Sequence, residues 1–212
     1  MTDPIPSHQS HQPRAVGPGT GTDLAALILR GTLGPMLFAH GWNKVAGPGG
    51  LRGTTGWFES LGLRPAGVHA RLAAATEMTA GAALTVGVAH PLPAAAAVGL
   101  MAVAGRTDHR GKGFFVFKGG WEYTGVVAGA AVALATLGHG RYSVDRFLPR
   151  RRAGLGSALL AAGLGTAGAA LLLKVSYRPE EPPEPGPGPE PDLDPDRTAE
   201  TTAETAETAE TM

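Results

Sequence analysis

Side chains that could exchange protons or bind a polar ligand gather near the ends of several apolar segments. His40 and Lys44 are four residues apart, so a helix places both on one face. His109 follows a later apolar segment. With residues of the neighbouring loops, the candidate polar site comprises His40, Lys44, Trp57, Glu59, His109, Glu122 and Tyr123. Histidine and carboxylate groups at one level suit ligand binding or proton transfer. Alternatively, the aromatic rings and the lysine simply anchor helix ends at a membrane surface.

A second pair of ionisable residues falls inside the apolar segments themselves. Arg30 lies about a third of the way through the first segment, and Glu77 lies near the middle of the second. Charged groups at such depths are costly in a bilayer and usually face protein or water. In antiparallel helices the two residues would lie roughly 9 Å apart in depth, at about 1.5 Å per residue. A long Arg side chain could bridge much of that gap, so we predict an Arg30–Glu77 ion pair, which could register the helices or relay protons.

Five apolar segments rich in Ala and Gly would position these residues. They lie at about 24–42, 70–89, 92–107, 123–137 and 154–173. A membrane-spanning helix needs roughly 20 predominantly apolar residues; the second and fifth segments supply them, and the third and fourth are marginal in length. Small pairs such as Gly163 with Ala167 and Gly125 with Gly129 would allow close helix packing. A soluble bundle would show a charged face at helical period, which the last two segments lack. The sequence therefore predicts an all-α, polytopic membrane helix bundle.

Charge divides the chain of 212 residues into two unlike parts, although its formal net charge is +0. Residues 179–212 hold 11 acidic residues and one basic residue, a net charge of −10, which leaves +10 on residues 1–178. This Pro-, Glu- and Thr-Ala-Glu-rich tail has too little apolar surface to fold. The Pro/Gly-rich N-terminal segment, called the lead, also has little apolar surface. We therefore predict a disordered lead at 1–22, a four-helix membrane domain at 23–148, a basic loop with an additional transmembrane helix at 149–178, and a disordered acidic tail at 179–212.

Composition excludes several classes of chemistry. The chain has no cysteine, which rules out disulfides, zinc fingers and Cys-ligated iron–sulfur clusters. Its seven histidines show no paired metal-ligand spacing, so we expect no metal site. The basic residues are spread over loops on both sides of the expected membrane, so we expect no nucleic-acid partner. Ten basic residues lie on the side of the expected membrane that holds the 43–69 and 106–120 loops, against six on the other side, which favours the first side as cytoplasmic. The Arg cluster at 150–152 lies on the other side and opposes this assignment, so the orientation stays open.

Five distinct motifs follow one another along the part of the chain that holds the first four apolar segments. They are GTLGPMLFAHGWNKVAG at 31–47, WFESLGLRP at 57–65, Glu77 with Gly81, DHRGKGFFVFKGGWEY at 108–123 and GHGRYSVD at 138–145. Together they resemble the DoxX family of bacterial and archaeal membrane proteins. The resemblance covers residues 24–147 and implies a four-helix integral membrane domain, to which this chain adds a fifth transmembrane helix and the tail. The matching signature positions are His40, Lys44, Trp57, Glu59, Glu77, His109, Glu122, Tyr123 and Asp145.

The resemblance also implies a functional setting, because the family is named after a subunit of an archaeal terminal quinol oxidase linked to thiosulfate:quinone oxidoreductase. We therefore expect a non-autonomous subunit of a quinone-linked redox complex in the prokaryotic plasma membrane, passing through it several times. Its partners would be the lipid bilayer and an oxidoreductase or other membrane-complex subunits, with quinone as the ligand. A non-enzymatic scaffold or anchor for soluble partners, a small transporter and homo-oligomerisation remain alternatives. Which residues, if any, are catalytic stays open.

Overall fold

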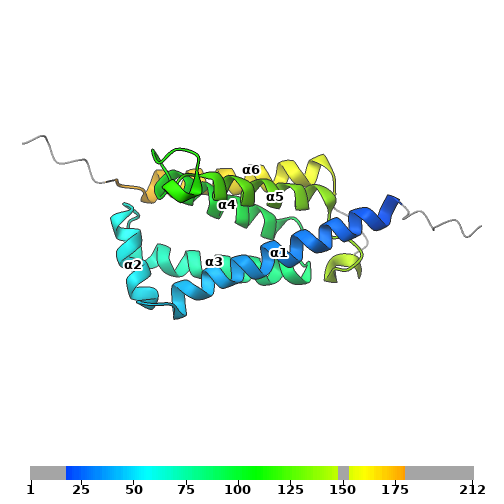
Figure 1. Cartoon of the computed structure of the whole chain (residues 1–212), viewed down its shortest axis with the longest axis horizontal. Coiled ribbons are helices and arrows are strands. Elements are labelled where there is room, and N and C mark those ends of the chain that lie inside the picture. The colour runs from blue at the N-terminus through cyan, green and yellow to red at the C-terminus, as the bar shows by residue number, and fades with distance from the viewer. Residues whose placement is uncertain (1–17, 148–152, 180–212) are drawn as a thin grey trace, which may run out of the picture. The chain divides into compact units, whose positions relative to one another are not determined.

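The apolar segments fold as helices in the computed structural model, which describes residues 18–147 and 153–179 (Figure 1). Its α-helices are α1 (Pro18–Ala46), α2 (Gly50–Ser60), α3 (Ala66–Val86), α4 (Leu92–Thr107), α5 (Glu122–Leu137) and α6 (Leu155–Ser176). Two 3-10 helices are η1 (Val116–Lys118) and η2 (Val144–Phe147). The described residues contain no strand, only an isolated β-bridge between Leu63 and Tyr177. The all-α class predicted from the sequence is therefore confirmed.

Two helix boundaries differ from the expectation. Helix α1 begins at Pro18, so the last five residues of the predicted lead are helical; proline is well suited to a first helical position because it lacks only an N–H that has no partner there. Helix α2 was expected as loop. It follows Gly49, whose φ of 81° favours glycine, and it buries Thr54 and Phe58. The remainder of the predicted lead and the acidic tail from residue 180 lie outside the described residues.

Helices α1 and α3 lie side by side and approach closely (Figure 1). A Cβ atom at Gly81 would lie only 2.5 Å from the backbone N of Phe38 and 2.6 Å from the carbonyl O of Gly34. A Cβ at Gly41 would lie 2.7 Å from the carbonyl O of Ala74. Small residues at the contact let the two backbones meet, as is common between membrane helices. This close approach brings the polar side chains of both helices within reach of one another.

Helices α4, α5 and α6 form a second layer, and its tightest contact lies between α4 and α6. A Cβ at Gly165 would lie 2.5 Å from the carbonyl O of Ala95 and 2.9 Å from the backbone N of Gly99. The expected packing sites were wrong: within the described part of the chain, a Cβ at Gly163 or Gly129 would meet no atom within 4 Å. A small residue permits close packing but does not specify which helix face is turned inward.

The two ends of the bundle are closed by different contacts. At the α2 end, Arg64 N donates to Ser176 O at 2.8 Å and Arg178 N donates to Gly62 O at 2.7 Å, which joins the α2–α3 connection to the C-terminus of α6. At the opposite end, called the η2 end, the Asp145 carboxylate accepts hydrogen bonds from the backbone N–H groups of Ala89 (3.1 Å) and His90 (2.8 Å). Asp145 therefore fixes the turn between α3 and α4.

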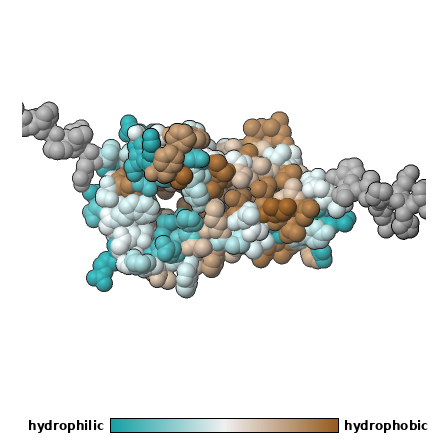
Figure 2. Space-filling view, viewed as in Figure 1, coloured by the Kyte–Doolittle hydropathy of each residue, from teal (hydrophilic) through white to brown (hydrophobic). Residues whose placement is uncertain are grey.

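Among the described residues, two helices are long and apolar enough to cross a membrane, judged by length and composition alone: Gly19–Ala46 and Leu155–Ser176. Helices α4 and α5 are apolar but have only 16 residues each. Helix α3 has 21 residues but is less apolar and does not pass this test. On the face seen in Figure 2, apolar residues gather over the half with the N-terminal part of α1, and hydrophilic residues prevail over the half with α2. The five-span arrangement thus stays a prediction.

Candidate functional site

A cavity of about 650 Å³ lies between the helices and is lined by residues from all six of them. Most of its lining is apolar, with leucine, alanine and glycine residues of α4 and α6 prominent. Its volume falls within the roughly 300–1,000 Å³ of small-molecule sites, which typically combine an apolar lining with a few convergent polar groups. Of the residues predicted from the sequence, the lining contains His40, Lys44, Trp57, Glu77, His109 and Tyr123.

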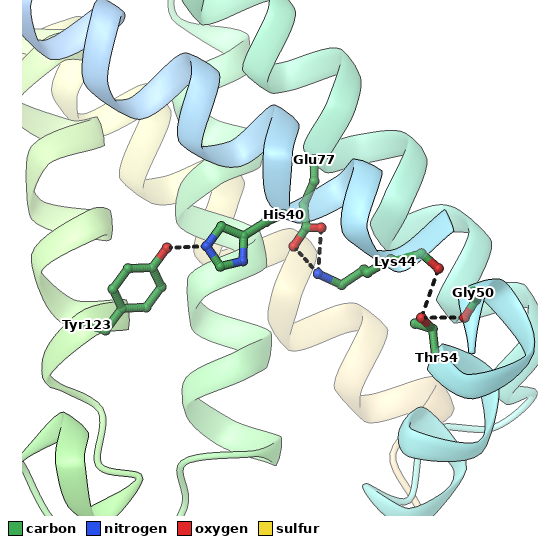
Figure 3. A network of polar contacts seen from close by, with 6 residues as sticks. All are labelled: His40, Lys44, Gly50, Thr54, Glu77 and Tyr123. Carbon is green, nitrogen blue, oxygen red and sulfur yellow. Dashed lines mark hydrogen bonds and ion pairs between the residues drawn. The ribbon is translucent and has the colours of Figure 1, made fainter. Parts of the chain in front are cut away.

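His40 and Tyr123 form a hydrogen-bonded pair across the cavity wall. His40 comes from α1 and Tyr123 from the first turn of α5, and His40 Nε2 lies 3.2 Å from the Tyr123 hydroxyl oxygen (Figure 3). The imidazole tautomer decides which group donates. The Tyr123 hydroxyl also lies 3.4 Å from Met36 Sδ, to which it donates its single proton when His40 is the donor to Tyr123. Both groups can give or accept a proton, so the pair can hydrogen-bond a ligand as donor or acceptor.

Lys44 and Glu77 form an ion pair beside this hydrogen bond. Lys44 Nζ lies 2.6 Å from Glu77 Oε2 and 2.8 Å from Oε1, and the side chains are only 14% and 9% exposed. Figure 3 shows the His40 ring between Tyr123 and this ion pair. Thr54 of α2 steadies the end of α1, since its hydroxyl donates to the carbonyl oxygens of Lys44 (3.0 Å) and Gly50 (3.1 Å).

The predicted Arg30–Glu77 ion pair is wrong. Arg30 is buried and donates to four backbone carbonyl oxygens, those of Leu84, Thr85, His139 and Tyr142, at 2.8–3.1 Å. Two of these carbonyls belong to the last turn of α3, where helical carbonyls have no partner in their own helix. Glu77 lies seven residues before Leu84, about 10 Å along the helix axis. Arg30 therefore caps α3 and holds the segment after α5 at the η2 end, while Glu77 faces Lys44.

Two residues of the predicted polar site, Glu59 and Glu122, lie outside the cavity lining. Glu59 forms an exposed ion pair with Arg64, whose Nη1 lies 2.6 Å from Glu59 Oε1. Glu122 Oε2 accepts a hydrogen bond from the backbone N–H of Val116 at 3.0 Å. Both carboxylates thus stabilise local structure at the α2 end.

His69 is a cavity residue that the sequence reasoning missed. It is buried, and its Nε2 lies 3.2 Å from the carbonyl oxygen of Arg64. The α3 residues that line the cavity are His69, Leu72, Ala73, Thr76 and Glu77. These positions follow the i, i+3, i+4, i+7, i+8 pattern of a single helix face. Counting back from Glu77 at this spacing would have found His69.

The arrangement suits a ligand with an apolar body and hydrogen-bonding oxygen atoms. The apolar walls can enclose the body, and the groups that can contact its oxygens include the His40 imidazole, the Tyr123 hydroxyl and the Lys44 ammonium group. Within residues 18–147 and 153–179, no group of three or more His, Asp or Glu side chains could hold a metal ion.

The comparison with known families gives a match over part of the chain. Residues 25–110 match the family model of DoxX. The matched range contains His40, Lys44, Glu77 and His109. The match ends before Tyr123, so the resemblance of the later motifs to the family stays a prediction. No curated protein and no solved structure matches the chain. The family match and the apolar helices together indicate a membrane protein. The resemblance to the DoxX family expected from the sequence is therefore confirmed over residues 25–110.

Proposed function

We propose that this protein is a multi-pass subunit of the prokaryotic plasma membrane that binds a quinone-type ligand beside a partner oxidoreductase. The observation that carries the proposal is the cavity of about 650 Å³ with the His40–Tyr123 and Lys44–Glu77 pairs on its wall. An apolar lining with few polar groups suits a molecule drawn from the lipid phase better than a water-soluble metabolite.

The chemistry of a quinone fits this distribution of groups. A quinone is a flat, largely apolar ring with carbonyl oxygens that accept hydrogen bonds. Donors that can reach a ligand in the cavity are His40, Tyr123 and Lys44. The small residues Gly168 and Ala169 leave room for an apolar body. Because Glu77 neutralises Lys44, the wall offers donors without an unpaired buried charge.

The subunit role follows from what the reaction needs. Conversion of a quinone to a quinol takes up two electrons and two protons. His40 and Tyr123 can pass protons at the cavity wall. The chain has no cysteine with which to ligate an iron–sulfur cluster, so the proposal assigns the electrons to a partner oxidoreductase and the positioning of the ring to this chain.

A matched pair of glycine variants in α6 tests ligand binding. Gly163 and Gly168 both have space for a side chain, since a Cβ at either would meet none of the described atoms within 4 Å, but only Gly168 lines the cavity. Purified protein in detergent is titrated with a short-chain benzoquinone and binding is followed by calorimetry. We expect the wild type and Gly163→Leu to bind alike and Gly168→Leu to bind at least about tenfold more weakly, a loss of about 1.4 kcal/mol. Equal binding by all three proteins, or none by the wild type, would refute the proposal.

A further inference from the structure

An exposed aromatic cluster lies in the connection between α4 and α5. This connection, residues 108–121, is called the aromatic loop. Phe117 is 77% exposed and Phe115 is 51% exposed, and their rings stack at 5.3 Å. Phe114 is also exposed and packs edge-on against Trp121 at 5.0 Å. A cluster of exposed aromatic side chains commonly marks a surface that contacts a membrane or another protein.

The backbone of the aromatic loop is well hydrogen-bonded although its rings face outward. Gly120 N donates to Phe115 O at 2.9 Å, and Trp121 N donates to Gly113 O at 3.1 Å. His109 Nδ1 lies 2.6 Å from Gly119 O. Irregular backbone near hydrocarbon needs its polar groups satisfied within the protein. The loop meets much of that requirement, so its rings project from an ordered support.

The lengths of the flanking helices place this loop near a membrane boundary. Helices α4 and α5 have 16 residues each, which corresponds to about 24 Å at 1.5 Å per residue. The hydrocarbon core of a bilayer is about 30 Å thick. A connection between two such short helices therefore lies within or just beside the hydrocarbon rather than out in water, and apolar side chains there compensate for the missing helix length.

Charge at the aromatic loop matches a lipid surface. Its cations are Arg110, Lys112 and Lys118, against the carboxylates of Asp108 and of Glu122, which directly follows the loop. Lys112 Nζ pairs with Asp108 at 3.2 Å. Lys118 Nζ lies 6.0 Å from the centre of the Phe117 ring. Basic groups beside exposed aromatic rings suit the phosphate level of a bilayer, where lysine extends its charge to the headgroups.

We propose that the aromatic loop embeds in the lipid bilayer, with the rings of Phe115 and Phe117 among the acyl chains and Lys118 at the lipid phosphates. The insertion rests on the multi-pass arrangement of the proposed function but not on quinone binding. Because Asp108 and His109 also line the cavity, insertion sets the α2 end of the cavity at the level of the lipid headgroups.

The lack of native cysteines allows a direct test. Phe117→Cys and the control Lys112→Cys are each labelled with bimane in the full-length protein and reconstituted into vesicles of phosphatidylcholine and phosphatidylglycerol. Both side chains are exposed, so neither change removes a core contact, and melting temperatures in detergent verify folding. We expect the label at 117 to lose fluorescence with lipids carrying a spin label in the acyl chain and to resist aqueous iodide. The label at 112 should show the opposite pattern.

Two outcomes would overturn the proposal. Quenching by iodide at both positions, without quenching by the lipid label at 117, would place the loop in water. Protection of position 117 from both quenchers would instead indicate a protein surface in contact with it, such as a second copy of the chain.

Discussion

At the level of single residues, the cavity wall depends on the few polar side chains that are buried with a partner. Lys44 and Glu77 are far less exposed than the ion pair of Glu59 and Arg64. Removing one member of a buried pair leaves a charge without compensation, whereas an exposed charge remains solvated by water. The two carboxylates should therefore respond very differently to truncation.

Glu77→Ala should lower the free energy of unfolding by about 3 kcal/mol, because Lys44, which is only 14% exposed, loses its carboxylate partner. Glu59→Ala, the matched control, should change it by less than about 1 kcal/mol. Titration with sodium dodecyl sulfate in mixed micelles measures both values. Similar losses for the two variants would show that the Lys44–Glu77 pair is not buried as described.

Arg30→Ala should cost at least about 3 kcal/mol, since each buried carbonyl left without a donor costs about 1–3 kcal/mol. In a double-mutant cycle, Arg30→Ala and Glu77→Ala should add to within about 0.5 kcal/mol, because the two residues share no partner. The cycle of Lys44→Ala with Glu77→Ala is the positive control and should show coupling. Coupling of Arg30 to Glu77 instead would restore the pair expected from the sequence.

Sequence spacing predicted part of this residue-level picture. The separation of His40 from Lys44 by four residues predicted one shared helix face, since one helix alone determines that geometry. Both residues line the cavity. The partner of Arg30 could not be predicted in the same way. Residue counting along a helix gives the depth of Arg30 and Glu77 but not the direction in which each side chain points. That direction depends on the rotation of α1 against α3, and the carbonyl oxygens at the C-terminus of α3 compete for Arg30; both are tertiary features.

At the level of helices, glycines determine how closely the layers pack. Gly165 of α6 faces the backbone of α4 at Ala95 and Gly99, whereas Gly163 has open space. A side chain added at Gly165 must therefore displace α4. A side chain added at Gly163 displaces none of the described residues. The same contact shapes the cavity, which both helices line.

Gly165→Leu should destabilise the protein by about 1–3 kcal/mol or more through overpacking. Gly163→Leu should be neutral or raise stability by up to about 1 kcal/mol, because leucine is the better helix former. Melting temperatures in a single detergent compare them. The α4–α6 contact would be misassigned if Gly163→Leu proved the more damaging of the two.

The existence of the long helices was predictable, but α2 was not. Its sequence GLRGTTGWFES contains three glycines and little apolar surface, which favours a loop on propensity alone. In the folded chain Phe58 belongs to a cluster with Leu63, Ala66 and Ala70, so tertiary burial outweighs the weak local preference.

At the level of the whole molecule, the proposed topology concerns the two ends of the bundle. The α2 end contains the aromatic loop, since Arg106 at the end of α4 lies over the ring of Tyr177 at the end of α6. The η2 end contains the α3–α4 turn and Asp145. The five-span arrangement places these ends on opposite sides of the bilayer.

Single cysteines test that arrangement. Val144→Cys at the η2 end and Arg52→Cys in α2 both replace exposed residues. A membrane-impermeant maleimide should label one variant in intact spheroplasts and the other in inverted vesicles. Labelling of both from the same side would refute the alternating topology. The side on which Arg52→Cys reacts also decides the orientation that the basic residues leave open.

The quinone content of the purified protein tests the central claim most directly. Full-length wild type, Gly163→Leu and Gly168→Leu are extracted in mild detergent from membranes of a quinone-producing host, and bound quinone per protein is measured by mass spectrometry. We predict that quinone accompanies the wild type and Gly163→Leu and is lost from Gly168→Leu, where the new side chain fills the cavity. Absence of quinone from the wild type, or equal amounts in all three proteins, would contradict a quinone-binding cavity.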